Sequence, residues 1–228
     1  IDIFIVFGWA RLIPKKLFKK NKIFLGMHGG MHKPPRCRGR AVFNWGLIYG
    51  HKTFYIYVMI LNYKVDDGKI VNLKKIKLTQ LDDIESLYIK YIYSGVRQIL
   101  SVINKIKNNK IKEIKFDLKK PSYLPQRNPE DGNINWNLKC TEIINFTRAI
   151  KFPFPGAYTC YNKTKIIIDE CMLFKKNINN SNKIGKINEV FYDNKFTVFC
   201  KDGSILIKNW KSKNKFIPKK GLLFKFNK

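Results

Sequence analysis

The spacing of apolar and polar residues predicts a mixed α/β arrangement for most of the chain. Apolar runs at 3–7 and 23–27 are typical of short buried strands, because glycine-containing turns follow each of them. From Asp82 to Ile106 apolar residues return every three or four positions, which indicates one long amphipathic helix packed through a single face. The other expected elements are helices at 15–20, 41–50 and 140–150, strands at 54–61, 69–73 and 163–173, and a loop at 28–40.

Beyond the polar stretch at 177–183 the pattern changes to short strands. Regular short strands separated by Asp-Asn and Asp-Gly turns favour a small β-barrel of the OB type. We therefore divide the chain into a first domain at 1–176 and a small β-barrel-like C-terminal domain at 184–228. The strands of the second domain are expected at 184–190, 196–200, 205–210 and 222–226.

The composition predicts a soluble globular protein with reduced cysteines. Hydrophobic residues make up 45% of the chain, enough for a sizeable core. No apolar run reaches the roughly 18 residues needed to cross a bilayer. The five cysteines are widely spaced and include no Cys-x-x-Cys pair, so we expect neither a zinc site nor a disulfide framework. The expected location is the cytoplasm, with no membrane contact and no metal.

The most extreme feature of the composition is a formal net charge of +29, from 45 Lys and Arg against 16 Asp and Glu. A surface this basic attracts polyanions through the release of counterions. The phosphates of a sugar nucleotide and those of a tRNA both qualify. The charge therefore leaves both partners open.

Residues 26–45 form the first motif that carries chemistry, Gly-Met-His-Gly-Gly-Met-His-Lys-Pro-Pro-Arg-Cys-Arg-Gly-Arg-Ala-Val-Phe-Asn-Trp. Three landmarks follow in order: Val-Asp-Asp-Gly-Lys-Ile at 65–70, Pro-Glu-Asp-Gly-Asn-Ile-Asn-Trp at 129–136, and Arg-Ala at 148–149 followed by Pro-Phe-Pro-Gly-Ala at 153–157. In this order the four landmarks resemble those of the folate-dependent formyltransferase family, which includes methionyl-tRNA formyltransferases and sugar N-formyltransferases.

The resemblance implies a fold and a reaction. Family members have a Rossmann-like parallel sheet with ligands at the carboxyl ends of its strands. The expected fold class is therefore α/β, with a partial Rossmann-like formyltransferase domain at 1–176 followed by the small β-rich domain. The chain opens within a predicted strand and without Met, so we expect the catalytic domain to lack its N-terminal part. The implied co-substrate is N10-formyltetrahydrofolate, whose formyl group is transferred to an amine.

The resemblance also implies which residues carry the chemistry. Formyl transfer to an amine needs a base near neutral pKa and a donor that stabilises the oxyanion. His28 matches the family's catalytic histidine, and Asp66 matches the carboxylate that orients the imidazole and stabilises its charged form. The family's catalytic Asn falls at Gly26, a departure that leaves His32 and Asn44 as candidate oxyanion donors.

Ligand contacts are implied at two segments and one pair of arginines. Folate is expected to bind largely through backbone groups, with Gly8 and Gly68 permitting its close approach. Arg38 and Arg40 are the candidate substrate-binding residues, because guanidinium groups pair well with phosphate and carboxylate. The residues expected to form the folate pocket are Trp9, Ala10, Arg11, Leu12, Ile13, Asp66, Asp67 and Gly68.

Three functions compete on this pattern. Gly8-Trp9 and the segment 40–45 resemble the sugar-directed members, so the preferred function is formyl transfer to the amino group of a nucleotide-linked amino sugar. Such members are often homodimers, which makes a homodimer one expectation. Methionyl-tRNA formylation is the alternative, favoured by the net charge and the β-rich tail. A degenerate, non-catalytic member is the third, because Gly26 departs from the motif.

Overall fold

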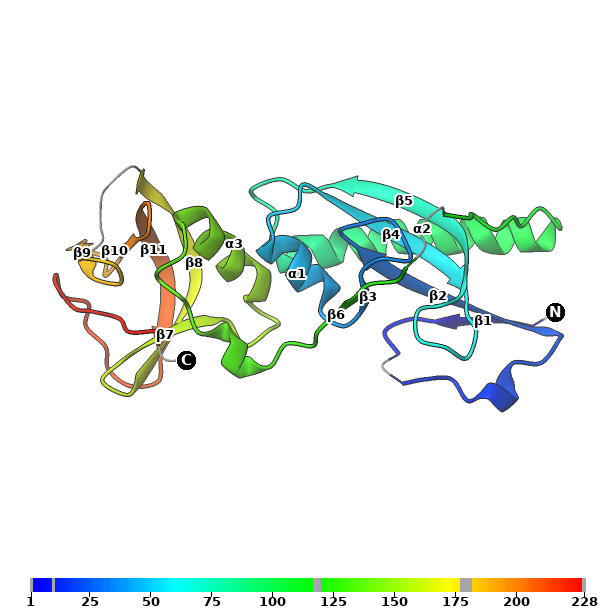
Figure 1. Ribbon diagram of the computed structural model, residues 1–228, viewed down its shortest axis with the longest axis horizontal. Helices are drawn as coiled ribbons and strands as arrows, with labels where there is room; N and C mark the ends of the chain where they lie inside the picture. The colour runs from blue at the N-terminus through cyan, green and yellow to red at the C-terminus, as the bar shows by residue number, and fades with distance from the viewer. Residues whose placement is uncertain (1, 10, 117–119, 177–181, 227–228) are drawn as a thin grey trace. The chain divides into compact units, whose positions relative to one another are not determined.

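The computed structural model describes residues 2–9, 11–116, 120–176 and 182–226. Its contacts group the chain into two compact units, traced in Figure 1. Unit 1 comprises Ile1–Gly46, His51–Asp82 and Ser86–Gln126, and unit 2 comprises Leu47–Gly50, Asp83–Glu85 and Arg127–Lys228. Residues 127–176 thus pack with the C-terminal strands. The sequence-based division into 1–176 and 184–228 remains a prediction about domains.

Unit 1 is built on a four-stranded sheet in the order β1-β2-β4-β5. β1 and β2 run parallel, joined by a crossing at 7–21, whereas β2, β4 and β5 pair antiparallel. The sheet is therefore mixed, with one parallel pair among the described strands. Its strands are β1 (Asp2–Val6), β2 (Lys22–Gly30), β4 (Thr53–Ile60) and β5 (Lys69–Lys77).

The prediction of a helix at 15–20 is wrong. The crossing between β1 and β2 holds only a single 3₁₀ turn, η1 (Lys15–Leu17), none of whose residues is buried. A helix this short gains too few backbone hydrogen bonds to offset its nucleation, and here no packed face compensates. Pro14 immediately precedes this turn.

The long helix predicted from Asp82 onward is confirmed as α2 (Ile84–Lys107). It covers one face of the sheet, and Figure 1 shows it running along the strands of unit 1. The buried residues that join the helix to the sheet are Leu25, Val58, Val71, Ile99, Val102 and Ile106. Within the described ranges, no helix combines the length and the apolar character that a membrane crossing requires.

The packing of α2 decides where the site lies on β2. Successive side chains of a strand point to opposite faces. Leu25 and Met27 lie on the face of the sheet that packs against α2. Gly26 and His28 therefore lie on the opposite face. The predicted catalytic histidine therefore lies on the face of the sheet that α2 does not cover.

The loop expected at 28–40 is shorter in the structure. β2 continues to Gly30, and Arg38–Gly39 forms a two-residue strand, β3, parallel to β6 (Tyr123–Leu124). α1 (Val42–Ile48) follows, inside the helix expected at 41–50. A strand of two residues leaves no alternation of apolar and polar side chains, so periodicity could not reveal it.

Unit 2 is β-rich, as predicted. Its sheet has five antiparallel strands in the order β7-β8-β11-β10-β9. The predicted strand at 222–226 is replaced by isolated bridges at Leu223 and Lys225. The elements are η2 (Pro129–Gly132), α3 (Cys140–Ile150), β7 (Ala157–Tyr161), β8 (Thr164–Lys176), β9 (Ile187–Val190), β10 (Phe196–Cys200) and β11 (Gly203–Ser212).

Aromatic side chains form part of the core of unit 2. The ring of Phe224 stacks on Trp136, with centroids 5.8 Å apart, and also contacts the fully buried Phe196. Offset aromatic pairs add to the free energy gained by burying their area. This explains how the segment after β11 is held without a continuous strand, since Phe224 is itself buried.

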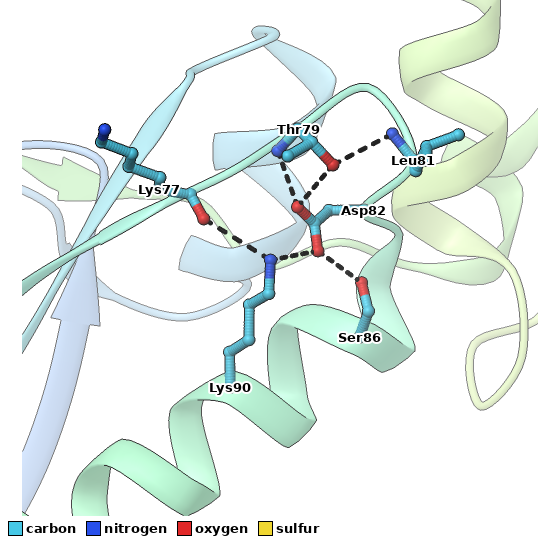
Figure 2. Close-up of polar contacts among 6 residues, drawn as sticks. All are labelled: Lys77, Thr79, Leu81, Asp82, Ser86 and Lys90. Atoms are coloured by element: carbon cyan, nitrogen blue, oxygen red, sulfur yellow. Dashed lines mark hydrogen bonds and ion pairs between the residues drawn. The ribbon is translucent and has the colours of Figure 1, made fainter.

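A buried carboxylate anchors the start of α2 (Figure 2). Asp82 accepts hydrogen bonds from the Thr79 backbone N–H (2.6 Å), the Ser86 hydroxyl (3.1 Å) and the Lys90 ammonium (2.5 Å). Burial by itself raises the pKa of this carboxyl, but the bonds from Lys90, Thr79 and Ser86 outweigh it and lower the pKa to about 2. Asp82 therefore stabilises the fold only while it is ionised.

We predict that Asp82→Asn lowers the free energy of unfolding by about 1–2 kcal/mol near neutral pH, because it removes a paired charge and weakens the hydrogen bonds that the carboxylate accepts. The pKa of the folded carboxyl lies below the ordinary 3.8, so its contribution is complete above that pH and is lost as pH falls toward 2. Urea unfolding at several pH values measures this. The difference between wild type and Asp82→Asn should shrink across that window.

The matched control is Asp193→Asn, which removes the ion pair with Lys195 on the surface of unit 2. Exposed pairs contribute little, so this variant should unfold as the wild type does. A pH-independent difference for Asp82→Asn would mean that packing, and not charge, gives Asp82 its role.

Candidate functional site

One hydrogen bond orients the imidazole of His28. Nε2 of His28 lies 3.1 Å from the backbone carbonyl oxygen of Cys37. A carbonyl oxygen only accepts, so Nε2 carries the proton and donates it. In the neutral ring Nδ1 is then the nitrogen with a free lone pair. The His28 side chain is 13% exposed, so it is sheltered but accessible.

The free nitrogen faces Asp66. Nδ1 of His28 lies 3.9 Å from Oδ1 of Asp66, whose side chain is 24% exposed. This distance exceeds that of a hydrogen bond but allows electrostatic attraction once Nδ1 is protonated. The other carboxylate oxygen, Oδ2, accepts the backbone N–H of Gly39 at 3.0 Å. The structure thus brings together the two residues that the sequence analysis proposed as the catalytic pair.

The turn that carries Asp66 is tightly built. Asp66 itself adopts a φ of 47°, in the left-handed region. At Gly68 a Cβ atom would lie 2.3 Å from the carbonyl oxygen of Ile60, a distance that backbone atoms cannot tolerate. The amide of Asn62 also donates to the backbone oxygen of Asp67, at 2.8 Å. Gly68 is therefore required by the turn between β4 and β5, a role it has besides the predicted contact with folate.

Arg38 is committed to an internal ion pair. Its Nη2 donates to Oδ1 of Asp67 at 2.6 Å. Burial by itself lowers the pKa of this guanidinium, but Tyr123 and Asp67 outweigh it and raise the pKa. Arg40 is exposed, and its Nη1 donates to Oε1 of Gln126 at 2.6 Å. A role of either arginine in substrate binding remains a prediction.

Gly26 stands where the family pattern has its catalytic asparagine, and a neighbouring side chain occupies the space beside it. Gly26 lies on the same face of β2 as His28, two residues away. A Cβ atom at Gly26 would lie 2.7–2.9 Å from side-chain carbons of Leu61. Leu61 is therefore the side chain that occupies the space beside Gly26.

The two alternative donors lie elsewhere. The ring of His32 makes an edge contact with His51, with centroids 5.1 Å apart. Asn44 sits in α1 and is only 2% exposed, so its amide has little access to a ligand from solvent. Tyr57, which no sequence motif indicated, pairs with His28 across β2 and β4 and contacts its ring edge-on, with centroids 5.7 Å apart. Only the strand register reveals that neighbour.

The segment expected to contact folate is open. Trp9 and Leu12 are 64% and 60% exposed, Arg11 is exposed and Ile13 is partly buried. Gly8 has a φ of 64° and open space beside its Cα. Ala10 lies outside the described residues. The Lys15 ammonium sits 5.2 Å from the Tyr63 ring, which brings this segment to the turn that carries Asp66.

A cavity of about 390 Å³ lies away from these residues, within unit 2. It is lined by residues of η2, α3 and their flanks, among them Arg127 and Phe146, and by none of the predicted site residues. Among the described residues, no cluster of three or more His, Cys, Asp or Glu side chains is arranged to hold a metal ion.

Comparison with known proteins gives two matching family models. The model described as formyl transferase matches residues 1–103, and the model described as formyl transferase, C-terminal domain, matches residues 127–220. Together they take in both the His28 loop and the β-rich unit.

The curated relatives include proteins with two different names. The bifunctional polymyxin resistance protein ArnA of Wigglesworthia glossinidia brevipalpis is 33% identical over 168 residues, which are 73% of this chain and 25% of that protein. The methionyl-tRNA formyltransferase of Fusobacterium nucleatum is 28% identical over 215 residues, 94% of this chain and 68% of that protein. The chain thus spans a quarter of the first relative and about two thirds of the second.

Solved structures share the fold. HypX from Aquifex aeolicus, in complex with tetrahydrofolic acid, superposes with a TM-score of 0.70 at 17% identity, over 94% of this chain and 36% of that one. The N-formyltransferase from Helicobacter canadensis, in complex with folinic acid and dTDP-3-aminofucose, gives 0.69 at 21%, over 90% and 72%. With both family models matched in order along one chain, the protein belongs to the formyl transferase family.

Proposed function

We propose that the protein transfers a formyl group from N10-formyltetrahydrofolate to the amino group of a nucleotide-linked amino sugar. The observation that carries this proposal is the orientation of His28, whose Nε2 donates to Cys37 while Nδ1 faces the carboxylate of Asp66. This is the arrangement of a general base whose charged form is stabilised by a nearby anion.

In the proposed reaction His28 handles the proton of the amine. As the amine nitrogen bonds to the formyl carbon, Nδ1 takes the proton that the nitrogen must lose. The imidazolium that results is stabilised by Asp66 at 3.9 Å and remains held by the Cys37 carbonyl. The same proton is then available to the nitrogen that releases the formyl group, so the base is regenerated.

The segment predicted to contact folate has side chains that suit a folate. When bound, N10-formyltetrahydrofolate supplies the formyl group. A pterin and its aminobenzoyl ring need an apolar surface and close backbone approach, and exposed Trp9 and Leu12 beside the open Gly8 provide both. These residues would hold the ring, and the turn at 66–68 would contact its edge.

One solved structure with the same fold supports an amino sugar as the acceptor, because it was obtained with dTDP-3-aminofucose. Methionyl-tRNA is the second candidate acceptor, supported by the F. nucleatum relative and by the net charge of +29. Both acceptors use the same amine chemistry at His28.

We predict that His28→Gln lowers kcat by about 10²–10⁴-fold, because it removes the base. Asp66→Asn should lower it by about 10–100-fold, because the imidazolium loses its stabilising charge. Release of tetrahydrofolate measures both. His51→Gln is the matched control and should change kcat little, since its ring lies against His32 and it has no proposed role in the reaction. Full activity in His28→Gln contradicts the mechanism.

We also predict that Gly26→Asn combined with Leu61→Ala raises kcat by about 10–100-fold over Leu61→Ala alone, because it adds an oxyanion donor beside His28. Gly26→Asn by itself should gain less, since its Cβ collides with Leu61. A double variant no faster than Leu61→Ala would show that the oxyanion donor is already present. Activity that appears only in the double variant would identify the natural protein as non-catalytic.

The acceptor itself is tested by direct competition. We expect tetrahydrofolate release with at least one dTDP-, GDP- or UDP-linked amino sugar, at a rate that depends weakly on salt. Methionyl-tRNA should be formylated slowly or not at all at equal concentration. Rapid formylation of methionyl-tRNA with a steep loss of affinity as salt rises would favour the second acceptor, because phosphate contacts release counterions.

A further inference from the structure

Residues 121–126, which we call the strap, run beside the loop at 37–45. Backbone groups of this loop contact His28 and Asp66. The backbone N–H of Arg38 donates to the Ser122 carbonyl at 2.8 Å, and Gly39 pairs with Leu124 in the two-residue β3–β6 ladder. At Gly39 the backbones approach so closely that a Cβ atom would lie 3.0 Å from the Leu124 oxygen. The strap is thus a backbone partner of this loop.

Side chains hold the far end of the strap. The indole Nε1 of Trp45 donates to the Pro125 carbonyl at 2.9 Å, and Arg40 donates to Gln126 at 2.6 Å. These bonds join residues about 80 or more positions apart in the chain. The strap is therefore anchored along its whole length to residues 37–45.

Residues 37–39 face the catalytic pair on their other side. The Cys37 carbonyl accepts from His28, the Arg38 side chain pairs with Asp67, and the Gly39 N–H donates to Asp66. Cys37 and Gly39 thus contact both the strap and the catalytic pair, whereas Arg38 contacts the strap and Asp67, the neighbour of Asp66. Any displacement of the strap is expected to reach both members of the pair.

Ser122 contacts Cys37, whose backbone conformation is the least favourable of the three for a residue with a side chain. Cys37 has a φ of 63°, in the left-handed region that residues with a side chain seldom adopt. Its backbone N–H donates to the Ser122 hydroxyl at 3.1 Å, while its carbonyl accepts from His28. The serine bond holds Cys37 in the conformation that aims its carbonyl at the imidazole.

We propose that Ser122 is a positioning residue, which fixes the orientation of His28 through Cys37 and so keeps Nδ1 directed at Asp66. Its effect on catalysis rests on the proposed function, whereas its effect on the imidazole does not. Two separate measurements therefore distinguish a failure of this proposal from a failure of the proposed reaction.

The first measurement is NMR of the imidazole. The protein has three histidines, so ring 15N signals are few, and the His28→Gln spectrum identifies that of His28. We expect the Nε2–H of His28 to be protected from solvent exchange in the wild type. In Ser122→Ala its exchange should accelerate about tenfold, because the Cys37 carbonyl is no longer held. Ser122→Thr keeps the hydroxyl and should retain the protection.

The second measurement is steady-state kinetics. Ser122→Ala should lower kcat about 3–10-fold with little change in KM, and Ser122→Thr should restore it. Ser101→Ala, on the exposed side of α2, is the matched control and should match the wild type in both measurements. Accelerated exchange in Ser122→Ala, found together with a wild type that has no activity, would support the positioning role while removing the proposed reaction. Unchanged exchange in a folded Ser122→Ala would overturn the positioning role, whatever its activity.

Discussion

The bond between the Cys37 carbonyl and Nε2 of His28 is the interaction on which the site depends. It decides which nitrogen of the ring keeps a lone pair, and therefore which side of the imidazole can accept a proton. Without it the ring could turn, and Nδ1 would no longer be directed at Asp66. Because the bond uses a backbone acceptor, its geometry is set by the conformation of residues 37–39, which the Ser122 hydroxyl contacts at the Cys37 N–H.

The surrounding fold supplies rigid supports for that bond. β2 carries His28 on the face opposite α2, and the buried contacts of Leu25 and Val58 with the helix fix the strand. The turn at 66–68 is held by the close approach of Gly68 to Ile60. The carboxylate and the imidazole thus come from two separate pieces of one sheet, which limits how far either can move. Functional groups placed on strands and tight turns keep their geometry better than groups on open loops.

One departure from the family pattern changes the chemistry more than the architecture. Gly26 removes a side chain next to His28, and Leu61 occupies the adjoining space, so the sheet stays packed. An apolar group there cannot donate a hydrogen bond to a developing oxyanion. In the proposed reaction, proton transfer at His28 does not depend on this side chain, whereas stabilisation of the oxyanion requires another donor. The proposed mechanism thus assigns the two requirements of acyl transfer to different groups.

The sequence by itself determined the helices and strands whose apolar residues recur at regular spacing. It also determined the two motifs that contain His28 and Asp66. The helix at 140–150 and the strand at 196–200 agree with α3 and β10, because their apolar periodicity reports burial directly. Only the tertiary structure decided that 38–39 pairs with 123–124, that Leu61 packs against Gly26, and that His32 turns to His51. Backbone pairing across 85 positions and contacts between distant side chains leave no pattern along the chain, so they emerge only when the chain is folded.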